Sequence, residues 1–119
     1  MWEVEATDEF AGWFDTLDDD GQLAVDFTVD LLIEQGPALR FPHSSGISGS
    51  RHAHMRELRV QFRGLPLRIF YAFDPRRSAI LLIGGGKAGD GRFYERMIPV
   101  ADTLYDVHLT ELRTEGLLK

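Results

Sequence analysis

Three strand-like runs follow one another in residues 55–88, and they constrain the fold more than any other part of the chain. Large apolar side chains recur at every second residue of 58–62, with Arg59 and Gln61 between them, and again in residues 67–73, with Arg68, Phe70 and Ala72 between them. Such alternation is typical of strands that bury one face. Residues 79–83 are apolar at every position, which predicts a third strand that is covered on both faces.

The turns between these runs are short. Gly64-Leu65 predicts a two-residue hairpin loop, which would place Val60 opposite Ile69. In that arrangement the arginines of both strands lie on the face opposite the apolar side chains. Residues 74–77, Asp-Pro-Arg-Arg, predict the second turn because proline favours a turn position.

Helical patterns flank the strands. After a short strand at residues 2–6, Thr7 or Asp8 can cap a helix whose aromatic residues have the spacing of a buried stripe. A second helix follows the Asp-rich break at residues 18–21 and ends at Gly36-Pro37. A long amphipathic helix closes the chain, and Pro99 either kinks it or begins a new segment there.

Residues 37–54 are rich in Gly, Ser and Pro and predict a long loop, which suggests a function or local disorder. The expected order of elements is therefore β-α-α-β-β-β-α within a single domain, residues 1–119.

Charge is distributed unevenly along the chain. The net charge is −6, but residues 1–39 hold eleven Asp and Glu and no Lys or Arg, whereas residues 40–96 hold eleven Lys and Arg against four acids. The basic block coincides with the strands, which favours a nucleic-acid partner despite the acidic total. The alternative is that acidic helices and basic strands neutralise one another.

Several classes of function are excluded or disfavoured. There is no Cys, so disulfides and thiolate metal sites are excluded, and His52 and His54 alone are too few to hold a metal. No apolar run is long enough to span a membrane, and the first ten residues do not read as a signal peptide, so a cytoplasmic protein is expected. Lys87 follows three glycines but precedes Ala88, which is inconsistent with a Walker motif. Those glycines instead indicate that the backbone approaches another group closely.

With these elements in place, the chain resembles a known family. The MRELRV segment, the RGLPLRIFYAF hairpin and the LLIGGGKAGDGRFYERMIPVADTLYDVHL ending are similar to the RelE/ParE superfamily of toxins from type II toxin–antitoxin systems, in its phage-derived, HigB-like branch. The resemblance covers nearly the whole chain. It implies a RelE-like α+β fold, in which an N-terminal strand and a helical hairpin pack on a small, twisted, mostly antiparallel sheet, with a C-terminal helix. It also implies an endoribonuclease that cleaves mRNA without a metal or other cofactor, mostly in the A site of translating ribosomes. It also implies a cognate antitoxin, expected to be a helix-turn-helix DNA-binding protein.

In this family a ribose 2′-hydroxyl attacks the adjacent phosphate and leaves a 2′,3′-cyclic phosphate. The reaction needs a proton acceptor, positive charge near the phosphorane oxygens, and stacking that aligns the RNA. The residues expected to act in catalysis are His54, Arg68, Lys87 and Tyr94, and those expected to bind RNA phosphates are Arg56, Arg59 and Arg92. His54 is the candidate acid or base. Alternatively, Arg59 and Arg68 pair with Glu57 or Asp74 on an exposed face.

Two departures from the family leave other functions open. The chain is acidic overall, and its only lysines are Lys87 and Lys119. A ParE-like inhibitor of DNA gyrase on the same fold is one alternative, and a non-catalytic module that binds a partner is another. In either case the acidic first helices would offer a docking surface for the antitoxin.

Overall fold

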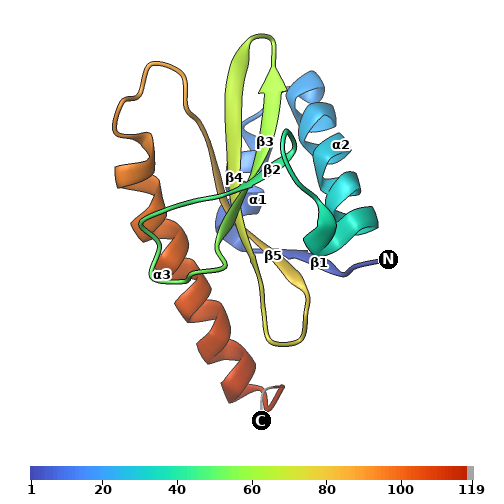
Figure 1. The fold of residues 1–119 in the computed structure, drawn as a ribbon, viewed down its shortest axis with the longest axis vertical. Helices are drawn as coiled ribbons and strands as arrows, with labels where there is room; N and C mark the ends of the chain where they lie inside the picture. The colour runs from blue at the N-terminus through green and yellow to red at the C-terminus, as the bar shows by residue number, and fades with distance from the viewer. Residues whose placement is uncertain (118–119) are drawn as a thin grey trace.

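A five-stranded sheet forms the centre of the molecule in the computed structural model, which describes residues 1–117 (Figure 1). The elements in chain order are β1 (Val4–Ala6), α1 (Asp8–Asp15), α2 (Asp19–Gln35), a 3₁₀ turn (Gly36–Ala38), β2 (Ser44–Gly46), β3 (Arg56–Phe62), β4 (Leu65–Phe73), β5 (Ala79–Gly86) and α3 (Phe93–Thr114). The strand order is β1-β5-β4-β3-β2. Only the β1–β5 pair is parallel, so the predicted α+β class and mostly antiparallel sheet are confirmed.

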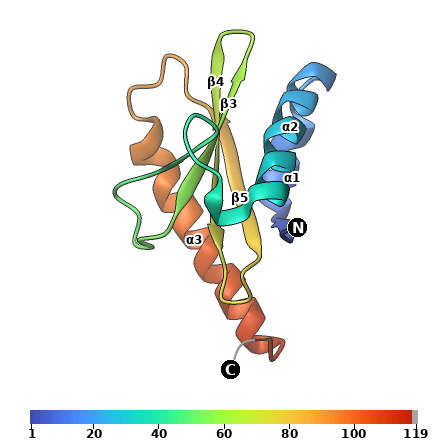
Figure 2. The ribbon, with the colours of Figure 1, turned by 45° about the vertical axis from the view of Figure 1, so that its right-hand side comes forward.

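Helices cover both faces of the sheet. Figure 2 shows α1 and α2 on one side and α3 on the other. Because side chains alternate along a strand, β4 contributes Ile69 and Tyr71 to the core beneath α1 and α2, and Phe70 to the core beneath α3. The residues of β5 from Ala79 to Leu82 are all buried, as predicted for a strand covered on both faces.

Helix ends follow the signals in the sequence. Thr7 accepts a hydrogen bond from the N–H of Phe10 at the start of α1, and Asp18 accepts one from Gly21 at the start of α2. α2 ends at Gly36, whose φ of +54° suits glycine. α3 runs without a break through Pro99, so no new segment begins there. In the described residues, no helix is long and apolar enough to span a membrane.

The predicted register of the β3–β4 hairpin is wrong by two residues. Val60 lies opposite Leu67, not Ile69, and Arg63-Gly64 forms the turn. Both turn residues have positive φ, 51° and 76°, as a type I′ hairpin turn requires. Because the shift is an even number of residues, every side chain keeps its predicted face.

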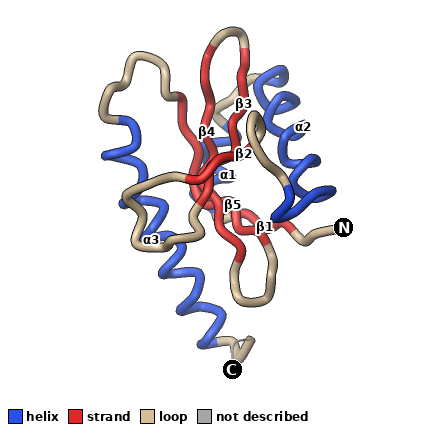
Figure 3. Tube along the Cα trace, in the orientation of Figure 1, coloured by secondary structure: helices blue, strands red, loops and turns tan. Residues whose placement is uncertain are grey.

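The strand β2 is an addition to the predicted order β-α-α-β-β-β-α. It lies within the segment 37–54, which was expected to be a loop, and pairs antiparallel with Arg56–Leu58 (Figure 3). The glycines that end β5 do allow a close approach: a Cβ on Gly84 would lie 2.3 Å from the Trp13 ring, and one on Gly85 would lie 3.0 Å from Phe93.

Candidate functional site

The predicted cationic residues meet on the sheet face that α3 covers. Arg59 on β3 lies directly opposite Arg68 on β4, which lies opposite Gly85 on β5. Residues paired across strands share a face, as do residues two apart along a strand. Glu57 and Arg59 therefore share this face with Arg68, and Lys87 joins them just beyond the end of β5.

A buried carboxylate occupies the middle of this group. The Glu57 side chain is only 4% exposed. Its Oε2 accepts a hydrogen bond from the Ser45 hydroxyl at 2.7 Å and faces an Arg59 nitrogen at 3.3 Å. Its Oε1 accepts a hydrogen bond from the Tyr94 hydroxyl at 2.7 Å and lies 3.7 Å from Nε of Arg68. Glu57 thus gathers side chains from β2, β3, β4 and α3 around one charge.

Arg68 is buried with part of its hydrogen-bonding capacity unused. Its side chain is 6% exposed, and one terminal nitrogen donates to the carbonyl of Leu67 at 3.0 Å. Its Nε is buried and has no hydrogen-bond partner among the residues described, because the Glu57 oxygen at 3.7 Å is too far. Buried donors are nearly always paired, so an unpaired guanidinium N–H calls for an explanation such as a ligand.

Tyr94 and Lys87 lie against each other at the edge of this group. The Lys87 Nζ is 5.1 Å from the centre of the Tyr94 ring, and the Lys87 N–H donates to the carbonyl of Pro66. Burial raises the pKa of the Tyr94 hydroxyl, the hydrogen bond to the Glu57 carboxylate raises it further, and Arg68 offsets part of the effect. The hydroxyl therefore stays protonated and is a donor at neutral pH.

An open cavity of about 250 Å³ adjoins this cluster. Its walls are Gly46, Ile47, Ser48, Glu57 and Tyr94. β2 and the residues after it thus form one wall, and the start of α3 forms another. The cavity gives an outside group access to the carboxylate and the phenol, which the sheet alone would not.

The structure does not bring His54 to this cluster. Its Nε2 lies 3.2 Å from the hydroxyl of Tyr105, which in turn donates to the carbonyl of Phe73. Phe73 is five residues along β4 from Arg68, a separation of about 16 Å in a strand. His54 therefore sits at the opposite end of the sheet, and its part in catalysis stays a prediction.

Arg56 and Arg92 also lie outside the central group. The Nε of Arg56 donates to the Ser44 hydroxyl, which contacts the Tyr71 hydroxyl on the sheet face that α1 and α2 cover. Arg92 is exposed at the start of α3, where its N–H donates to Asp90. Arg56 thus faces away from the cluster, and a role of Arg56 or Arg92 in binding RNA stays a prediction.

No metal site is evident in residues 1–117, which contain no group of three or more His, Cys, Asp or Glu placed to hold an ion. His52, considered as a ligand with His54, instead points its Nε2 at Asp106 at 2.8 Å. The cluster around Glu57 instead contains cations and hydrogen-bond donors, which are the groups that can bind a phosphate.

Two residues of the cluster, Glu57 and Ser45, were not among the predicted site residues. Glu57 was considered only as an exposed partner for the arginines, and it does pair with Arg59 and Arg68, but in the interior. Its position two residues before Arg59 was a usable signal, since it placed both side chains on one face. Ser45 gave no such signal, because its approach to Glu57 depends on the pairing of β2 with β3.

The chain was also compared with known proteins. The family described as "Phage derived protein Gp49-like" matches residues 12–106, a span that includes every residue of the cluster. "Putative toxin HigB3" of Mycobacterium tuberculosis is 44% identical over 91 residues, which is 76% of this chain and 78% of that protein. "Putative toxin HigB2" of the same organism is 38% identical over 112 residues, which is 92% of this chain. The chain spans only 55% of the length of HigB2.

Proposed function

This chain belongs to the phage-derived Gp49-like protein family, and from that membership we propose that it acts as the toxin of a toxin–antitoxin pair. The two mycobacterial relatives carry toxin names, which agrees with the HigB-like resemblance seen in the sequence. In finer detail, we propose a metal-independent endoribonuclease that cleaves mRNA on translating ribosomes and is held inactive by a cognate helix-turn-helix antitoxin.

The observation that carries the ribonuclease proposal is the unpaired Nε of buried Arg68, which faces Glu57; Glu57 and its partner Tyr94 line an open cavity. Arg59 and Arg68 face the single carboxylate of Glu57, and Lys87 lies against Tyr94, so the cluster keeps a positive excess. A phosphate oxygen would supply the missing acceptor for Arg68. Arginine suits this task because its planar fork of donors matches phosphate geometry.

The residues can be assigned to the steps of a 2′-hydroxyl attack. The 2′-oxygen bonds to phosphorus while the 5′-oxygen leaves, which yields a 2′,3′-cyclic phosphate and a free 5′-hydroxyl. Arg68 and Lys87 stabilise the negative charge that gathers on the phosphorane oxygens. Glu57 can take the 2′ proton, and the Tyr94 phenol, kept protonated, can give one to the leaving oxygen.

Induced expression of the chain without a partner tests this proposal, with primer extension on cellular mRNA to map new 5′ ends. We expect growth arrest and new ends for the wild type. Lys87→Ala should abolish both and leave the circular dichroism spectrum and melting temperature unchanged. Arg113→Ala, which removes an exposed cation at the far end of α3, is the matched control and should stay active. His54→Ala in the same assay tests the predicted catalytic histidine.

Two other outcomes would replace the proposal. Induction of the DNA-damage response without RNA cleavage would favour a gyrase inhibitor on this fold. Harmless expression of a folded protein would favour a non-catalytic binding module.

A further inference from the structure

The outer edge of β3 is only partly covered. β2 pairs with Arg56–Leu58, and the N–H of Arg59 then donates to the carbonyl of His43 at 2.8 Å. β3 continues to Phe62, and within residues 1–117 no strand lies on this side of its last three residues. The edge of the sheet is therefore open here.

The open edge presents Gln61 to the outside. The N–H of Arg59 points away from β4, and in an antiparallel ladder the direction repeats every second residue, so the N–H and C=O of Gln61 point outward too. Pro66 lies opposite Gln61 on β4 and has no N–H, so it cannot donate a hydrogen bond to Gln61. Unpaired groups on an exposed edge form a template for another strand.

An apolar groove lies beside this edge. A cavity of about 350 Å³ separates β3 from α2, with Phe27 on the helix side, Arg59, Val60 and Gln61 on the strand side, and His43 on the segment before β2. Phe27 is 60% exposed, and Leu23, one helical turn before it, is 65% exposed. Large apolar side chains left in solvent next to a cavity mark a site of contact with another molecule.

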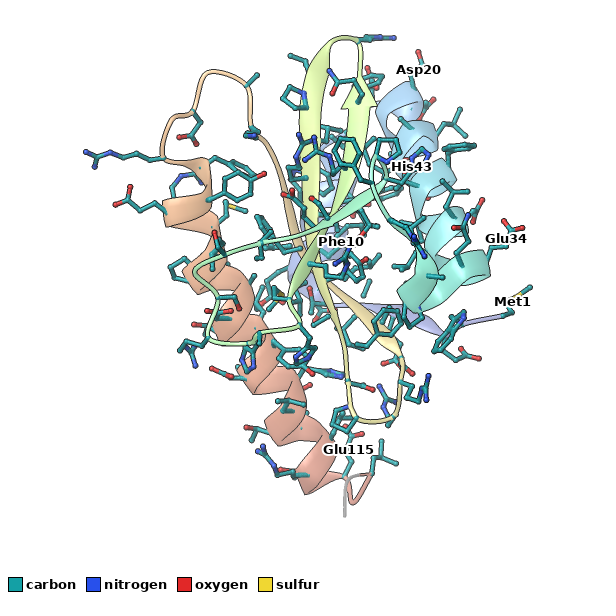
Figure 4. The ribbon with its side chains drawn as sticks, in the orientation of Figure 1. Met1, Phe10, Asp20, Glu34, His43 and Glu115 are labelled. Carbon is teal, nitrogen blue, oxygen red and sulfur yellow. The ribbon has the colours of Figure 1, made fainter. Side chains whose placement is uncertain are left out.

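The exposed face of α2 beside the groove is acidic, although no Asp or Glu lines the groove itself. α2 holds five Asp and Glu and no Lys or Arg. Asp30 and Glu34 follow Phe27 at helical spacing and are exposed, so they continue the stripe that Leu23 and Phe27 begin. Figure 4 labels Asp20 and Glu34 towards the two ends of α2, and His43 on the segment that runs beside it. A segment in the groove would meet negative charge along one side.

We propose that this groove binds an extended, basic peptide segment of a protein partner, which adds as a strand to the Gln61 edge and buries apolar side chains against Phe27. Backbone pairing at the edge would supply affinity, and every second side chain would enter the groove. A helical segment would leave the Gln61 groups unpaired, and an acidic one would be repelled by α2. The proposal does not depend on ribonuclease activity.

A fluorescein-labelled nonapeptide of alternating lysine and leucine is the probe for this site, and one of alternating glutamate and leucine is its control. Fluorescence polarisation with the full chain at low salt should show saturable binding of the first peptide and none of the second. Phe27→Ser should weaken binding about tenfold, as expected when an aromatic anchor is removed. Val107→Ser removes an apolar residue of similar exposure, 49%, from α3 and should change little.

A second variant tests the strand edge itself. Gln61→Pro removes the outward N–H without breaking the β3–β4 ladder, so a folded Gln61→Pro protein should lose binding. Hydrogen exchange should show that the peptide protects amides in residues 59–62. Equal binding by wild type and Phe27→Ser, equal binding of both peptides, or protection confined to other segments would each overturn the proposal.

Discussion

Glu57 is the residue on which the candidate site depends. Burying a carboxylate between two arginines costs desolvation, and such a pair is often no more stabilising than well-packed apolar residues. The arrangement makes better sense as a way to hold Arg59, Arg68 and Tyr94 in fixed positions. The same carboxylate also lowers the positive potential that a phosphate would meet, so stability and phosphate binding are expected to oppose each other here.

Glu57→Gln separates these two effects. The amide keeps the shape of the side chain but removes its charge, which leaves Arg68 buried without a counter-charge, so we expect a loss of about 3 kcal/mol in unfolding free energy. Binding of inorganic phosphate or of a short RNA should tighten, while cleavage should fall if Glu57 takes the 2′ proton. Urea unfolding and phosphate titration measure the two quantities. Glu95→Gln, on the exposed side of α3, is the control and should change neither.

Asp74 gives the chain a specific dependence on pH. Its side chain is fully buried, which by itself would raise the pKa of the carboxyl, but hydrogen bonds from His108 and Arg76 lower the pKa below its ordinary value. The unfolded chain binds a proton at Asp74 more readily than the folded one. The stabilisation is therefore present at neutral pH and is lost as the pH falls through about 4 toward the lower, folded pKa.

Arg76→Gln tests this linkage. At pH 7 we expect it to lower the unfolding free energy by about 1–2 kcal/mol, since one strong hydrogen-bonding partner of a buried carboxylate is lost. The difference from wild type should shrink as the pH drops below about 4, where the carboxyl is protonated in the unfolded chain. Urea unfolding at several pH values measures it. A difference that stays constant down to pH 3 would contradict the assignment.

At the scale of elements, α1 packs closely on β5 because Gly84 has no side chain. The Trp13 ring sits directly on Gly84, so that a Cβ there would lie 2.3 Å from ring atoms. The ring is fixed by its packing, so it cannot move aside for a Cβ as the end of a flexible side chain could. Of the three glycines that end β5, Gly84 is therefore required for packing against Trp13 on one face of the sheet. The candidate site lies on the other face.

Gly84→Ala should cost about 2–3 kcal/mol, because overpacking forces either the helix or the strand to move. Gly86→Ala is the matched control in the same strand, where a Cβ would meet only Leu67 at an ordinary 3.8 Å. It should be nearly neutral. Thermal unfolding of both variants measures the difference, and similar melting temperatures would show that α1 can shift away from the sheet at little cost.

Elements with a strong local pattern could be predicted from the sequence, and those defined by their partners could not. The strands β3, β4 and β5 and the caps of α1 and α2 follow from period-two alternation, Thr7 and Asp18. β2 consists of Ser-Ser-Gly and exists only because β3 offers it an edge. The hairpin register depended on Arg63 adopting positive φ, which is uncommon for arginine.

The same distinction applies to the candidate site. Alternation within the strands correctly placed Arg59 and Arg68 on one face, and Lys87 and Tyr94 join them there. The spacing of Glu57 and Arg59 indicated that they share a face, but the pairing of Glu57 with Tyr94 could not be predicted, because Tyr94 comes from α3, 37 residues later in the chain. His54 contacts Tyr105, far from the cluster. These residues are 51 positions apart in the chain, so no local pattern could predict the contact.

At the scale of the whole molecule, the uneven charge of the sequence becomes a separation between two sides of the sheet. The helices α1 and α2, which carry acids and no Lys or Arg, cover one face. Arg59, Arg68 and Lys87 lie on the other. The net charge of −6 therefore does not describe the immediate surroundings of these three cations, although α3, which covers the same face, itself holds four Asp and Glu against two Arg.

This separation predicts how salt should act on RNA binding. Each phosphate contact with single-stranded RNA releases about 0.7 counterion, so affinity should fall as salt rises, with a slope set by the contacts on the α3 side of the sheet. Lys87→Met should make the log–log slope shallower by about 0.7, because it removes one cation that we propose to contact phosphate. Arg113→Met, which removes an equal charge at the far end of α3, should leave the slope unchanged although the net charge is the same as in Lys87→Met. Equal slopes for all three proteins would mean that RNA does not contact Lys87, and equal losses in both variants would mean that only the total charge matters.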